Sequence, residues 1–222
     1  MRAGRHAMPE AAAEVAQQFE DLEQERETVG LGMWIFLAQE VMFFGGLFTV
    51  YAVYRRLHRA AFAEASRHLD LVLGTANTAV LLLSSLTMAL AVRAAQRGSR
   101  RMCALYLGGT MSLGAVFLGV KALEYAHKVR DGLLPGPGFD GALFRHAGAE
   151  LFFSLYFVMT GMHALHMLIG IALLACVLRR SLQGRYGPQR HWGVEVLGLY
   201  WHFVDVVWIF LFPLLYLFER HA

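Results

Sequence analysis

Charged residues are scarce in this chain of 222 residues. Asp, Glu, Lys and Arg make up 17% of it, hydrophobic residues make up 57%, and the mean hydropathy is +0.44. That is more apolar surface than one soluble core requires. The two cysteines, Cys103 and Cys176, fall on different apolar segments, so a disulfide framework is not expected. The composition predicts an integral membrane protein.

The start of the chain lacks a short, charged, cleavable leader. Residues 1–28 are mostly polar, and the first apolar run after them is of full length, so this run should itself direct insertion. Good helix formers over residues 10–26 follow Pro9 and predict a short cytoplasmic helix. We therefore expect a cytoplasmic N-terminal segment over 1–28 and a single membrane domain over 29–222.

Five apolar stretches are long enough to cross a hydrocarbon core of about 30 Å, which takes about 20 helical residues. They cover residues 30–54, 69–92, 102–125, 150–178 and 194–218. The expected fold class is all-α, an integral membrane bundle of five transmembrane helices. The longest connection, residues 126–148, is rich in glycine and proline and predicts an ordered excursion on the outer face.

Basic residues gather at the ends of these stretches and form no single stripe, which argues against nucleic acid as a partner. With alternating sides, the side of the N-terminus holds eleven: Arg2, Arg5, Arg26, Arg93, Arg97, Arg100, Arg101, Arg179, Arg180, Arg185 and Arg190. The opposite side holds eight: Arg55, Arg56, Arg59, Arg67, Lys128, Arg130, Arg145 and Arg220. The positive-inside rule then predicts a cytoplasmic N-terminus and an external C-terminus.

Ionisable and polar side chains inside the membrane stretches are costly, so each needs a partner or a function. Glu40 should be protonated, paired, or turned to water or a lipid headgroup; proton relay, lipid anchoring and a plain interhelical hydrogen bond all remain open. Asn77 and the small polar residues after it are expected to join helices. Lys121 and Glu124, three residues apart, can form an ion pair on one helix face.

Histidines raise the possibility of a metal. His163 and His166 lie three apart on the fourth stretch, and His202 lies on the fifth with Asp205 three residues later. Such residues could ligate a metal or haem, but no Glu-x-x-His pair of a di-iron bundle is present. We favour hydrogen-bonded packing for His163 and His166, and expect Asp205 to fix the imidazole of His202. No catalytic residue and no metal ligand is expected.

Five motifs occur in order along the chain: QEVMFF (39–44), NTAVLLLSS (77–85), FLGVKALEY (117–125), TGMHALH (160–166) and YWHFVDVVW (200–208). Together they resemble subunit III of the haem-copper respiratory oxidases, in its shorter five-helix form. The resemblance implies a non-catalytic subunit that packs against subunit I and other oxidase subunits. Haem and copper are then expected in those partners, and bound phospholipid in this chain.

The resemblance further implies support of proton uptake, oxygen access and stability of subunit I. The lipid-contacting positions of the family match Glu40, Arg179 and His191. We expect a subunit of a cytochrome c oxidase in a bacterial-type inner membrane. The alternatives are subunit III of a quinol oxidase and an accessory subunit of nitric oxide reductase. A free-standing membrane metalloenzyme is an alternative of a different class.

Overall fold

The computed structural model describes residues 21–184, 186–187 and 190–217. The cytoplasmic helix expected over residues 10–26 therefore lies largely outside the described residues. Its last part belongs to a long membrane helix, α1, that begins at Leu22.

Five long helices confirm the predicted transmembrane bundle, since each is long and apolar enough to cross a membrane. The helices are α1 (Leu22–Leu57), α2 (Arg59–Ser66), α3 (Leu71–Gln96), α4 (Arg100–Arg130), α5 (Ala149–Leu182) and α6 (Trp192–Phe212). A 3-10 turn, η1 (Gly141–Leu143), lies in the long connection, and a π-helical turn, η2 (Pro213–Leu217), continues α6. Only α2, a short helix that crosses nothing, had no counterpart among the predicted stretches.

The long helices extend beyond their apolar stretches because good helix formers and caps continue them into the polar region. At the start of α1, the Asp21 side chain accepts a hydrogen bond from the Gln24 backbone N–H at 2.8 Å. At the start of α3, Asp70 does the same for Leu73 at 3.0 Å. Such caps satisfy backbone donors that a helix cannot pair internally. Hydropathy thus locates the part in the membrane, and caps locate the helix ends.

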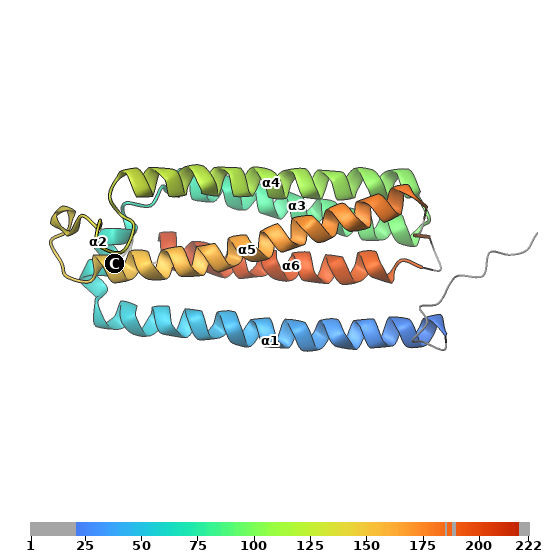
Figure 1. The fold of residues 1–222 in the computed structure, drawn as a ribbon, viewed down its shortest axis with the longest axis horizontal. Coiled ribbons are helices and arrows are strands. Elements are labelled where there is room, and N and C mark those ends of the chain that lie inside the picture. The colour runs from blue at the N-terminus through green and yellow to red at the C-terminus, as the bar shows by residue number, and fades with distance from the viewer. Residues whose placement is uncertain (1–20, 185, 188–189, 218–222) are drawn as a thin grey trace, which may run out of the picture.

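The five long helices lie side by side, and α1 flanks the group formed by α3, α4, α5 and α6 (Figure 1). The centre of that group is the fully buried indole of Trp201. Two glycines make room for it: a Cβ at Gly114 would lie 2.7 Å from the ring, and one at Gly170 would lie 3.0 Å from it. Close approach of α4 and α5 to α6 therefore depends on these two positions.

The connection between α4 and α5 is ordered, as predicted, and it is tied to α2. Glu64 of α2 accepts hydrogen bonds from the backbone N–H groups of Arg145 and His146, at 3.0 and 3.3 Å, and lies 3.0 Å from Nδ1 of His146. These contacts hold the pKa of Glu64 below its usual value, and the Arg145 N–H is the largest cause. The short helix and the long connection thus cover one end of the bundle together.

Candidate functional site

A buried polar cluster joins α4, α5 and η2. The Lys121 ammonium lies 2.9 Å from Oε2 of Glu124, and both side chains are buried. It also donates to the hydroxyls of Tyr156 and Tyr216, at 3.1 and 3.0 Å, and both hydroxyls donate to Oε1 of Glu124, at 3.0 and 2.6 Å. The ion pair follows from the spacing in the sequence. The two tyrosines were not foreseen, because they come from other helices.

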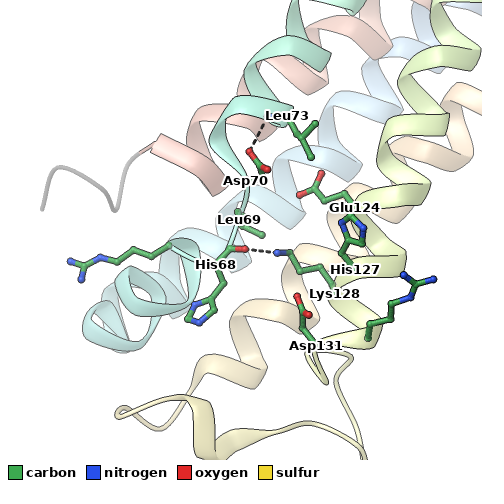
Figure 2. Close-up of a pocket in the computed structure, with 10 residues that line it drawn as sticks. His68, Leu69, Asp70, Leu73, Glu124, His127, Lys128 and Asp131 are labelled. Atoms are coloured by element: carbon green, nitrogen blue, oxygen red, sulfur yellow. Dashed lines mark hydrogen bonds between the residues drawn. The ribbon is translucent and has the colours of Figure 1, made fainter.

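A pocket of about 420 Å³ lies beside this cluster, at the end of the bundle where α3 begins and α4 ends (Figure 2). Its lining is Arg67, His68, Leu69, Asp70, Leu73, Glu124, His127, Lys128, Arg130 and Asp131. Lys128 reaches across it to donate to the backbone carbonyl of His68. Because Glu124 belongs to both the lining and the cluster, the buried ion pair meets the pocket at this carboxylate.

A second polar pair joins α1 to α5. Oε2 of Glu40 lies 3.1 Å from Nε2 of His166, and Glu40 is only 8% exposed. Nδ1 of His166 lies 2.8 Å from the Met162 carbonyl, an acceptor that requires a proton on Nδ1. The contact with Glu40 therefore holds one shared proton, either as a carboxylic acid beside neutral imidazole or as carboxylate beside imidazolium. Glu40 is paired within the chain.

An apolar groove of about 240 Å³ separates α1 from α6 next to this pair. It is lined by Val41, Phe44, Gly45, Phe48, Phe203, Val206, Val207 and Phe210. The Phe44 ring packs edge-on against His166, with ring centroids 5.2 Å apart. The Glu40–His166 pair therefore stands behind the groove wall. Gly45 has open space around it, so its small size serves no contact among the described residues.

The other two candidate lipid residues lie at a different depth. Arg179 is exposed in the last turn of α5, and His191 precedes α6 with Nε2 3.2 Å from Oε1 of Glu195. At a rise of 1.5 Å per residue, the 13 residues from His166 to Arg179 span about 20 Å. Glu40 is therefore about that distance from Arg179 along the bundle. The structure does not bring the three residues together into one site.

The small polar residues of α3 join helices, as expected. Asn77 donates to the backbone carbonyl of Phe117 on α4 at 3.2 Å. Two indole N–H groups of α6 donate to hydroxyls of α3, one from Trp201 to Ser84 at 3.1 Å and one from Trp208 to Thr78 at 3.0 Å. These bonds make α3, α4 and α6 one unit.

The expected contact between Asp205 and His202 is wrong. Nδ1 of His202 lies 2.8 Å from the hydroxyl of Ser85 on α3. Both carboxyl oxygens of Asp205 are buried without a hydrogen-bond partner among the described residues. Three residues of separation put the two side chains on one helix face, but Ser85 on the neighbouring helix offers the closer partner. A single sequence does not reveal such a neighbour.

The expected hydrogen bonding of His163 is also wrong. Its ring is buried, and neither ring nitrogen has a partner within the described part of the chain. It packs instead against Phe117 and Trp208, with centroids 5.5 and 5.2 Å away. The histidines therefore do not converge. Among the described residues, no three of His, Cys, Asp and Glu are placed to hold a metal ion.

The family model for cytochrome c oxidase subunit III matches residues 11–220. The chain belongs to this family. It is 37% identical over 191 residues to cytochrome c oxidase subunit 3 of Thermostichus vulcanus, covering 86% of this chain and 87% of that one. The corresponding protein of Synechocystis is 38% identical over 187 residues, covering 84% and 74%. Quinol oxidase subunit 3 of Bacillus subtilis is 35% identical over 188 residues, covering 84% and 85%.

Membership in the subunit III family makes this chain a multi-pass membrane subunit of a respiratory oxidase complex. Members of the family carry no haem or copper themselves. The polar contacts described above agree with that role, because they connect helices to one another. The alternative of a free-standing metalloenzyme is thereby set aside.

Proposed function

We propose that this chain is subunit III of a proton-pumping terminal oxidase that takes electrons from cytochrome c, with subunit I as its principal partner. The family match over residues 11–220 carries this proposal. Relatives named cytochrome c oxidase subunit 3, at 37% and 38% identity, favour cytochrome c as the donor. The Bacillus subtilis relative named quinol oxidase subunit 3, at 35%, makes quinol the second candidate.

Purification of the intact complex through a tag on this chain tests the proposal. We expect subunit I, haem and copper to co-purify, and a two-copper centre to be present in a further subunit, because that centre receives electrons from cytochrome c. An untagged strain taken through the same steps is the control. Haem and one copper without the two-copper centre would indicate a quinol oxidase, and no haem at all would refute the oxidase assignment.

Within the complex, the proposed role is to hold phospholipid and to support subunit I in stability, oxygen access and proton uptake. The apolar groove between α1 and α6 suits acyl chains, since its lining is apolar side chains and one glycine. The exposed guanidinium of Arg179 at a helix end suits a lipid phosphate, and His191 lies at the same end of the bundle. Glu40 lies behind the groove, in contact with His166.

Glu40→Gln is expected to lower the phospholipid retained per complex while haem and copper content stay unchanged. The amide can still hydrogen-bond His166, but it cannot carry the charge that the carboxyl group can share with it. Phospholipid is measured by mass spectrometry after extraction, and metals by elemental analysis. Glu150→Gln, in the first turn of α5, is the matched control. Loss of a metal from the Glu40 variant, or unchanged lipid, would contradict the role.

For orientation, we propose that the N-terminus is cytoplasmic, in a bacterial-type inner membrane. Eleven basic residues on that side against eight on the other support it. A membrane-impermeant thiol reagent added from outside should label a cysteine placed at Gly138, in the long connection, and spare one placed at Ser99, between α3 and α4. The background should lack the native cysteines. The reverse pattern would invert the topology.

A further inference from the structure

A polar spot interrupts an otherwise apolar surface where α3 meets α6. We define this α3–α6 seam by Leu82, Ser85, His202 and Ile209. Leu82 is 52% exposed and Ile209 is 45% exposed, while Ser85 and His202 are half-buried between them. The helical spacings of three and seven residues put each pair on one face of its helix. The 2.8 Å contact between Ser85 and His202 joins the two halves of the seam.

The imidazole of His202 has an unmet hydrogen bond in either tautomer. If Nδ1 accepts from the Ser85 hydroxyl, Nε2 carries the proton and must donate. If Nδ1 donates to Ser85, Nε2 must accept. Nε2 makes no hydrogen bond to any residue in the described part of the chain. Beneath it lies Asp205, 3% exposed, whose two oxygens also lack a partner there.

The depth of His202 limits what can meet this need. It is the eleventh residue of a span that runs over 26 residues from Trp192 to Leu217, so it lies near the middle of the membrane. Acyl chains have no hydrogen-bonding groups at that depth, and bulk water is absent. A polar group facing the hydrocarbon there is unfavourable. A protein side chain is the occupant that matches a polar spot inside an apolar rim.

We propose that the α3–α6 seam binds a transmembrane helix of subunit I that presents a hydrogen-bonding side chain to Nε2 of His202. The identity of the partner rests on the proposed function. The partner helix packs its apolar side chains against Leu82 and Ile209 and places its polar group between them. Ser85 fixes the ring, so that Nε2 points toward the partner. Asp205 adds negative or acidic character behind the ring and biases its protonation.

Site-specific photo-cross-linking in the intact complex tests the seam directly. A benzophenone amino acid is placed at Leu82 or Ile209, with Val116 as the control: its side chain is 51% exposed near the middle of α4. Cross-links from both seam positions to a peptide of subunit I are the expected result, with none from Val116. Cross-links from the seam only to lipid or to a second copy of this chain would overturn the proposal.

The control also separates this inference from the proposed function. Cross-links to subunit I from Val116 but not from the seam would reject the seam and leave the oxidase assignment standing. If neither seam nor control reaches an oxidase subunit, and the tagged chain brings down no haem, the proposed function itself fails. Each probe is introduced into an otherwise unaltered chain, so the result does not depend on a variant that weakens the polar contacts.

His202→Phe, which keeps a ring but removes its nitrogens, gives a second test. Recovery of subunit I with the tagged chain should fall roughly tenfold, the range expected for an interhelical hydrogen bond in a membrane. His202→Gln should restore part of it, since the amide can donate and accept. His127→Phe is the matched control, as His127 is exposed on α4 away from the seam. Equal recovery for both phenylalanine variants would count against the seam.

Discussion

Glu124→Ala is expected to be the most destabilising single truncation in the bundle. It leaves the Lys121 ammonium, 5% exposed, without its counter-charge, and it removes the acceptor of the Tyr156 and Tyr216 hydroxyls. Removing one partner of a buried ion pair costs about 3–5 kcal/mol, because the other charge stays buried and unpaired. The loss should appear as a large drop in the thermal unfolding temperature of the detergent-solubilised complex.

A double variant separates the charge effect from the loss of packing. In Lys121→Met with Glu124→Met, neither charge remains, so most of the stability should return; replacing a buried pair by apolar residues of similar volume is often neutral. The two tyrosine hydroxyls still lose partners in the double variant, so recovery should be incomplete. If Glu124→Ala alone is as stable as the double variant, the ammonium is not held as an unpaired charge, and the cluster is weaker than its geometry indicates.

The sequence predicted the five helices because a membrane leaves few options. Backbone groups in hydrocarbon must be satisfied within the segment, so a long apolar run becomes a helix. The boundaries were less accurate: α1 begins at Leu22, eight residues before the predicted start at Gly30. Those eight residues are polar, and their helix is fixed by the Asp21 cap. The short helix α2 was missed because it crosses nothing and is stabilised by burial of Phe62 against Tyr51 and Phe152.

Polar partners were predictable within a helix and poorly predictable between helices. Lys121 and Glu124 pair as their spacing of three residues suggests. Glu40 needed a partner, but only the packing of α1 on α5 identifies it as His166, 126 residues away. The same limit explains why His202 was assigned to Asp205 when its contact is Ser85, 117 residues away in the chain. Helix order alone does not say which faces of two helices meet.

Removing the chain from the oxidase complex should leave the initial turnover substantial and make activity decay during catalysis. The described polar groups mostly bind one another: Lys121 binds Glu124 and Glu40 binds His166. His163 stands apart between aromatic rings. Because these side chains hold helices together, the effect of the chain on electron transfer must be indirect, through proton supply, oxygen access or rigidity of subunit I.

Oxygen consumption is followed over successive turnovers in the stripped complex, in the intact complex, and in the stripped complex after the purified chain is added back. The stripped sample should start at a rate comparable to the intact one and then lose activity, and adding the chain back should restore the steady rate. Rebinding of the His202→Phe variant should protect less, because it attaches more weakly. A stripped complex with a normal spectrum but no haem reduction from the first turnover would mean that electrons need this chain, and the supporting role would be wrong.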